Sequence, residues 1–147
     1  MDAKIKIIMM LIPFMLASTA CAKVPIIPQP EVTDNIIFER TNQLREFQNL
    51  KPLVMSHELN VKALDWSKRQ HNGACGILRK ICHKYSPENV AYISNTKITM
   101  SQAEEQFFKM WNNSRGHYRN MVGPYSKIGI GVYKGPKGYY ATQIFKK

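Results

Sequence analysis

The spacing of apolar residues changes along the chain, and this change constrains the fold more than any other feature. Residues 128–132 alternate isoleucine or valine with glycine, which is the period of a β-strand. Residues 134–138 are rich in Gly and Pro, as in a turn, and residues 139–145 are rich in β-forming side chains. The two runs predict a β-hairpin. Because a stable sheet needs at least one more strand, residues 89–94 or 51–54 are expected to supply it.

Earlier segments instead repeat apolar residues at helical spacing, and each follows a side chain that is able to cap a helix. Three helices are expected: one from Thr33 or Asp34 to about Gln48, one from Ser56 to about Gln70, and one that starts at Thr99 or Ser101 and has Trp111 in its buried stripe. Helices that precede a closing hairpin in one chain favour an α+β fold with layered elements.

The first 22 residues have the three parts of a secretory signal. Two lysines precede an apolar stretch, residues 7–17, and small residues follow it up to Ala22. We therefore expect cleavage before Lys23 and a secreted, extracellular protein. A retained membrane anchor is the first alternative, but it would need about 20 apolar residues. A lipoprotein acylated at Cys21 is the second, although Ser18 stands where the acylation signal usually has leucine.

Removal of this signal peptide, residues 1–22, leaves enough chain for one domain. Residues 23–35 contain three prolines and are expected to form an extended leader, followed by a single domain over residues 36–147. The whole chain has 21 Lys and Arg against 10 Asp and Glu, a formal net charge of +11. This charge favours anionic partners such as membranes, glycosaminoglycans, cell-wall polyanions or nucleic acid; a solvated basic surface is the alternative. No run of five Lys and Arg occurs, so a dedicated nucleic-acid site is not expected.

Two cysteines, Cys75 and Cys82, remain after removal of the signal. They lie seven positions apart in a polar, loop-like stretch, and in an exported chain they predict one disulfide. A zinc site is the alternative, but a structural zinc ion requires four ligands.

Five short segments are informative when they are taken together. They are Asn42-Gln43-Leu44-Arg45, Leu59 with Ala63 and Trp66, Glu88-Asn89-Val90-Ala91, the segment 111–121, and 128–132 with 140–145. In this order they resemble the CAP family of cysteine-rich secretory, antigen 5 and pathogenesis-related proteins. The resemblance implies a three-layer α-β-α sandwich with a C-terminal β-hairpin. Two departures are that Thr41 stands where many members have histidine, and Pro87 where the family usually has glycine.

The resemblance also implies a cleft, which this family builds from two histidines and two acidic residues and which holds a divalent metal in some members. By position, the matching residues are His83, Glu88 and His117, with Ser114 in the fourth place. Imidazole and carboxylate groups are suitable ligands for Zn²⁺ or another divalent metal, so His83, Glu88 and His117 form a candidate metal set. The alternatives are that His83 is an ordinary exposed histidine, that Glu88 anchors a loop by accepting backbone hydrogen bonds, and that His117 caps or hydrogen-bonds the end of a helix.

Many CAP proteins are secreted effectors, and some bind sterols or other lipids. We therefore expect a secreted binding or effector protein rather than an enzyme, with an anionic membrane or matrix surface, a lipid or an extracellular protein as its partner. The alternative is a metal-dependent hydrolase that uses the same cleft. Ser114 and His117 lie three residues apart, so a serine hydrolase is a further alternative. Asn112 begins an N-glycosylation sequon inside the cleft motif.

Overall fold

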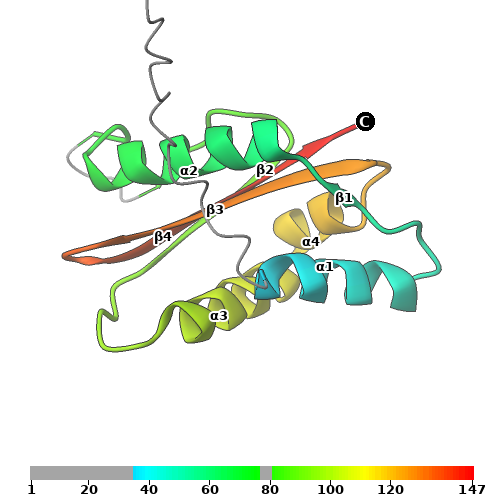
Figure 1. The fold of residues 1–147 in the computed structure, drawn as a ribbon, viewed down its shortest axis with the longest axis horizontal. Coiled ribbons are helices and arrows are strands. Elements are labelled where there is room, and N and C mark those ends of the chain that lie inside the picture. The colour runs from blue at the N-terminus through cyan, green and yellow to red at the C-terminus, as the bar shows by residue number, and fades with distance from the viewer. Residues whose placement is uncertain (1–34, 77–80) are drawn as a thin grey trace, which may run out of the picture. The chain divides into compact units, whose positions relative to one another are not determined.

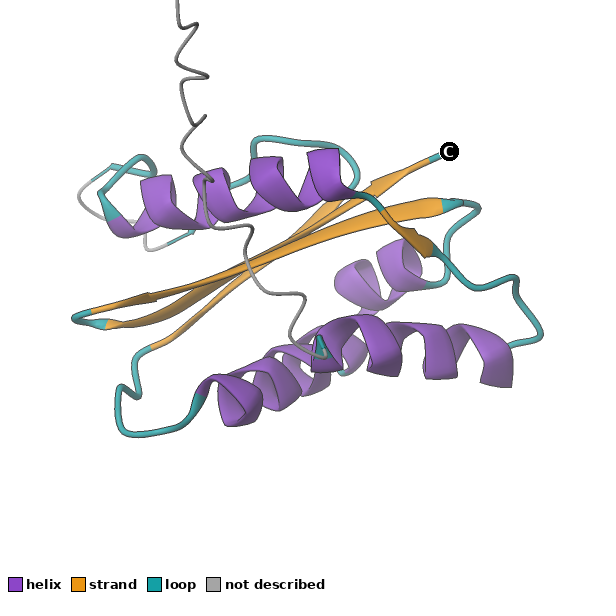
Figure 2. Cartoon of the chain, viewed as in Figure 1, coloured by secondary structure: helices purple, strands orange, loops and turns teal. Residues whose placement is uncertain are grey.

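A sheet of four strands divides the helices into two layers (Figures 1 and 2). The structure is a computed structural model that describes residues 35–76 and 81–147, so the expected signal peptide lies outside the described residues, as does the leader up to residue 34. The described residues fall within one compact unit, Val32–Lys147. Along the chain the elements are α1 (Ile36–Phe47), β1 (Val54–Met55), α2 (His57–His71), β2 (Glu88–Ile93), α3 (Met100–Asn112), α4 (Arg115–Met121), β3 (Lys127–Gly135) and β4 (Gly138–Lys146).

Strands form on both sides of the hairpin, although the segments were expected as alternatives and β1 contains only the last residue, Val54, of the stretch 51–54. The strands lie in the order β1-β3-β4-β2, in which β3 and β4 form the predicted C-terminal hairpin. β2 pairs antiparallel with β4, whereas the two-residue strand β1 pairs parallel with β3. The turn is tighter than expected, because only Pro136 and Lys137 lie between the two strands. Gly138 has a φ of 139°, which a residue with a side chain rarely adopts.

Helix α2 covers one face of the sheet (Figure 1). It begins after the predicted cap, Ser56, whose side chain accepts a hydrogen bond from the N–H of Leu59. The glycines of β3 allow the helix to lie close to the strand: a Cβ atom on Gly131 would be 2.1 Å from the backbone nitrogen of Leu64. Ser67 Oγ donates to the Gly131 carbonyl oxygen over 2.9 Å. The alternation of glycine and isoleucine in β3 therefore places a close helix contact on one face and apolar side chains on the other.

Helices α1, α3 and α4 cover the opposite face (Figure 2), where the main hydrophobic core includes Ile37, Phe107, Trp111, Met121, Ile128 and Phe145. The predicted Thr99 cap of α3 is present and forms a capping box with Gln102. α1 begins after Asn35, one residue beyond the expected cap, and the Asn35 side chain accepts from the N–H of Phe38. α4 was not expected from the sequence. Within residues 35–76 and 81–147, no helix has the length and apolar character needed to cross a bilayer.

Candidate functional site

Glu88, the first residue of β2, lies at the centre of the candidate cleft. Only 1% of its side chain is exposed. Its Oε1 atom accepts a hydrogen bond from the N–H of Lys84 and lies 3.2 Å from Nδ1 of His83. Its Oε2 atom is buried and has no hydrogen-bond partner among the described residues. Burial raises the pKa of Glu88, against the opposing effects of the Lys84 and Tyr85 N–H groups and of His83.

His83 lies at the open side of the cleft, because 62% of its side chain is exposed. It directly follows Cys82, which forms the predicted disulfide with Cys75. The backbone of Cys82 is held on α2: Trp66 Nε1 donates to its carbonyl oxygen over 3.2 Å, and its N–H donates to Gln70 Oε1 over 3.4 Å. The disulfide and these two hydrogen bonds place His83 beside Glu88. The loop residues 77–80, between the two cysteines, lie outside the described residues.

His117 approaches the cleft from α4, and its Nδ1 atom lies 2.8 Å from Ser114 Oγ. Ser114 is the N-cap residue of α4, yet its side chain makes no capping hydrogen bond. The hydroxyl that would satisfy the helix N-terminus therefore orients the imidazole instead. Burial lowers the pKa of His117, and the charge of His83 lowers it further. His83 and His117, 34 positions apart in sequence, thus interact electrostatically in the fold.

A network of amide side chains holds α4 against the sheet and thereby positions His117. Asn120 Nδ2 donates to the Glu88 carbonyl oxygen over 3.0 Å and to Asn89 Oδ1 over 2.9 Å. Asn89 Nδ2 in turn donates to the His117 carbonyl oxygen and to Gln143 Oε1. These amides lie within the sequence motifs, but no role is predicted for them from the sequence alone. The sequence nevertheless contains an indication of this network: Asn89 and Gln143 lie inside strands, and a buried polar side chain there needs a hydrogen-bond partner.

Thr41 completes this network at the position where many CAP proteins have histidine. Its hydroxyl accepts from Gln143 Nε2 over 2.9 Å and donates to the Ile37 carbonyl oxygen over 2.7 Å. Thr41 is fully buried, so it acts as a link between α1 and β4 rather than as an exposed cleft residue.

The side chains of the cleft do not form a three-ligand metal centre. Among residues 35–76 and 81–147, no group of three or more His, Cys, Asp and Glu side chains is placed to hold a metal ion. Ser114 contributes a hydroxyl where the family has an acid, and this hydroxyl contacts His117. The unpartnered Oε2 of Glu88 is an available acceptor, but the set lacks the second carboxylate that would favour a divalent cation. The predicted metal set stays a prediction.

The distribution of charge along the chain is a second functional feature, and it is not among the features predicted above from the sequence. Residues 106–147 contain eight Lys and Arg and no Asp or Glu. Of these eight, only Lys109 forms a salt bridge with a described residue, Glu105. All eight are exposed, and they extend over α3, α4 and the hairpin. This uneven distribution of charge can be read from the sequence, because Glu105 is the last acidic residue of the given chain.

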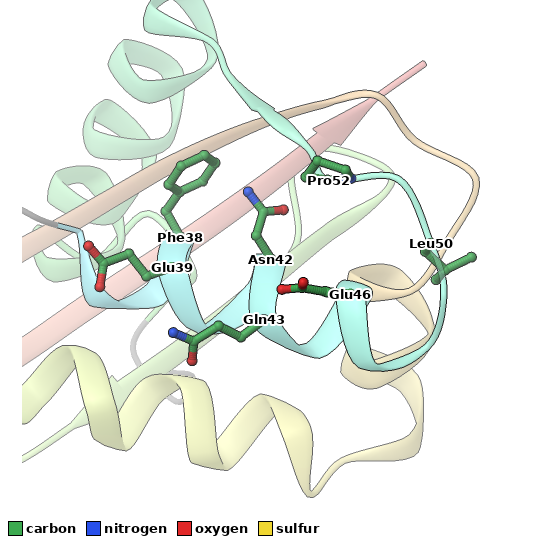
Figure 3. A pocket seen from close by; sticks show the side chains of 7 residues that line it. All are labelled: Phe38, Glu39, Asn42, Gln43, Glu46, Leu50 and Pro52. Carbon is green, nitrogen blue, oxygen red and sulfur yellow. The ribbon is translucent and has the colours of Figure 1, made fainter.

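Two hollows lie elsewhere on the surface and share no residue with the cleft. One, of about 520 Å³, runs along α1 (Figure 3) and is lined by Phe38, Glu39, Asn42, Gln43, Glu46, Leu50 and Pro52. Within it, the Asn42 amide is already committed to the backbone of Leu53, with hydrogen bonds of 2.8 and 3.0 Å. The other, of about 420 Å³, lies between α1 and α3 and includes the exposed Phe47.

Comparisons with solved structures show which proteins share this fold. The chain is similar to an outer surface protein from Borrelia burgdorferi, with 19% identity and a TM-score of 0.56 over 76% of this chain and 90% of that chain. It is similar to NaASP2, solved with Zn²⁺, with 18% identity and a TM-score of 0.57 over 74% of this chain and 76% of that chain. It also matches an extracellular SCP-domain protein from Bacillus anthracis, with 23% identity and a TM-score of 0.53 over 76% of this chain and 39% of that chain.

Comparison with curated protein sequences finds no match. The sequence model of the cysteine-rich secretory protein family, CAP, matches residues 38–145. This match spans every described helix and strand except the first residues of α1 and the last residue of β4. The predicted α-β-α layering and the closing hairpin are likewise those of the structure. The chain therefore belongs to the CAP family of cysteine-rich secretory proteins.

Proposed function

We propose that this CAP protein is an extracellular binding module that attaches to an anionic surface through the cations of its C-terminal third. The observation that supports this proposal is the absence of any acidic residue after Glu105, while eight Lys and Arg follow it. The charge of an exposed cation without an acidic neighbour is not neutralised within the protein, so it can attract an external anionic partner. Export accords with the predicted signal peptide and with the disulfide between Cys75 and Cys82.

The contacts in the cleft favour binding over hydrolysis. The raised pKa of Glu88 and the lowered pKa of His117 mean that both groups tend to be neutral when buried. Ser114 contacts Nδ1 of His117, but Glu88 is paired with His83, so no single chain of serine, histidine and acid is formed.

Retention on a heparin column, eluted with a salt gradient, tests the proposal. Two variants with the same loss of three charges provide the comparison. The test variant replaces Lys127, Lys134 and Lys146 with glutamine, and the control replaces Lys51, Lys68 and Lys97 with glutamine. We expect the test variant to elute at clearly lower salt than the control, because the cations after residue 105 have no acidic neighbours in sequence.

Two results would contradict this proposal. The wild-type protein would pass through the column at low salt without retention, or both variants would elute at the same reduced salt concentration. The second result would mean that only the net charge matters.

A metal-dependent hydrolase is the competing prediction, and calorimetric titration with Zn²⁺ tests it directly. His83→Ala and His117→Ala serve as matched variants, since the predicted ligand set contains both histidines. Saturable binding to the wild type that both substitutions abolish would favour the hydrolase over the binding module. Binding that neither substitution changes would place the metal elsewhere.

A further inference from the structure

Two lysines that form no salt bridge with any described residue face each other at the open end of the hairpin. Lys127 in β3 and Lys146 in β4 are register partners, and both are exposed. Their side chains lie on the face of the sheet that α2 covers, because Gly129 and Ile144, two positions along each strand, contact Leu59 of α2. Like charges directly opposite each other destabilise a sheet. This pair therefore works against the fold unless an external group neutralises it.

One carboxylate lies within electrostatic range of this pair, and it is bound to a third lysine. Glu58, in the first turn of α2, has a pKa lowered first by its hydrogen bond with Lys62 and further by the charges of Lys146 and Lys127. Its Oε1 atom lies 2.5 Å from Lys62 Nζ. Among the described residues, neither Lys127 nor Lys146 forms a salt bridge. Lys62, Lys127 and Lys146, here called the lysine cluster, thus share one acid and keep a net positive charge.

Two exposed valines adjoin members of the lysine cluster, one in strand register and the other in sequence. Val54 is the register partner of Lys127 in the parallel pair β1·β3, and it is 65% exposed. Val61 precedes Lys62 in α2 and is 52% exposed. Apolar side chains beside lysines suit the boundary between lipid headgroups and acyl chains, where lysine stems lie along apolar surface and the ammonium groups reach the headgroups. A soluble polyanion would make no use of the valines.

We propose that the lysine cluster, together with Val54 and Val61, is the surface through which this protein contacts a bilayer that contains anionic lipids. The lipid phosphate and carboxylate groups neutralise the opposed lysines, and the valines enter the interfacial layer. This inference rests on the proposed function, because it specifies which anionic surface is bound and which residues contact it.

Sedimentation with lipid vesicles tests this inference on the purified protein. The vesicles contain phosphatidylcholine alone or with about 30 mol% phosphatidylserine, since anionic lipid attracts basic residues near the surface. The test variant replaces Lys127 and Lys146 with glutamine. The matched control replaces Lys134 and Lys137, which lie at the other end of the same hairpin, with glutamine. Each lysine near such a membrane changes the partition coefficient about fivefold. We therefore expect about a 25-fold loss for the test variant, and a clearly smaller loss for the control, whose two lysines lie outside the lysine cluster.

The replacement of both Val54 and Val61 with serine separates a membrane from a soluble polyanion. We expect this variant to bind anionic vesicles less tightly than the wild type, with unchanged retention on heparin. Equal losses for the two lysine variants would refute the localised surface but leave the proposed function intact. Retention on heparin without any binding to vesicles would refute the lipid partner. Failure of the wild type to bind either would refute the proposed function itself. Thermal unfolding of each variant checks that the fold is retained.

Discussion

Arg45 joins the segment after α4 to helix α1, and its replacement is expected to destabilise the domain strongly. Its side chain is buried, and its nitrogens donate four hydrogen bonds to carbonyl oxygens. Nε donates to Lys51 over 2.8 Å, Nη1 to Met121 and Gly123 over 2.9 Å each, and Nη2 to Tyr125 over 3.3 Å. One guanidinium thus fixes the chain between α4 and β3.

The substitution Arg45→Lys keeps the charge but removes the planar fork that reaches all of these oxygens. A lysine ammonium is a compact group, so we expect it to replace about half of the four hydrogen bonds. A hydrogen bond to a charged group contributes about 1.5–3 kcal/mol, and two lost bonds therefore lower the free energy of unfolding by about 3–6 kcal/mol. Burial already lowers the pKa of Arg45, and a lysine at this site would carry a similar desolvation penalty.

Urea denaturation followed by tryptophan fluorescence measures this loss. Arg40→Lys is the control, because Arg40 lies on the same helix but forms an exposed salt bridge of 3.1 Å with Glu105. We expect that control to change the free energy of unfolding by less than about 1 kcal/mol. If Arg45→Lys also lost less than about 1 kcal/mol, the guanidinium would not hold this segment in the way its hydrogen bonds indicate.

Three further predictions concern the sheet and the cleft. Gly131→Ala is expected to destabilise the domain by about 3 kcal/mol or more in urea denaturation, because the added Cβ atom would collide with α2. Gly116→Ala is the control: its Cβ atom would have no atom within 4 Å, so this variant should stabilise α4 by about 0.5–1 kcal/mol. The raised pKa of Glu88 means that the folded state holds this proton more tightly than the unfolded chain, so stability falls as pH rises above the ordinary glutamate value. Glu88→Gln should therefore gain stability relative to the wild type between about pH 4 and pH 7, and a constant difference across this range would contradict the assignment. Ser114→Glu should raise the pKa of His117 by about 1 unit in an NMR titration by placing a carboxylate beside it, and an unchanged midpoint would show that the side chain points elsewhere.

Local signals in the sequence predicted the elements whose formation depends on short-range interactions. The caps at Ser56 and Thr99 are those of the structure, and so is the hairpin from residue 127 to residue 146. Capping hydrogen bonds and strand alternation involve residues within a few positions of each other, so they can be recognised along the chain. The hairpin strands extend further than expected because the Gly-Pro-Lys-Gly turn occupies only its two central residues.

Helix α4 was missed because its stability comes from tertiary contacts. It has seven residues, and its N-cap Ser114 makes no capping hydrogen bond. An isolated helix of this length would not persist in water. Hydrogen bonds from Asn89 and Asn120 hold it on β2, and these pairs lie about 30 positions apart in sequence.

The sequence by itself determined the layered α+β architecture, the disulfide partners and the excess of positive charge, since each follows from residue types and spacing. Family resemblance identified His83, Glu88 and His117, but only the tertiary structure decided how deeply each of them is buried. Burial differs sharply between Glu88 and its exposed partner His83, and this asymmetry depends on what the whole fold packs around each group. The opposed lysines, Lys127 and Lys146, likewise became neighbours only through the register of the hairpin. Electrostatic free energies depend on distance and solvent exposure, and a linear sequence contains neither.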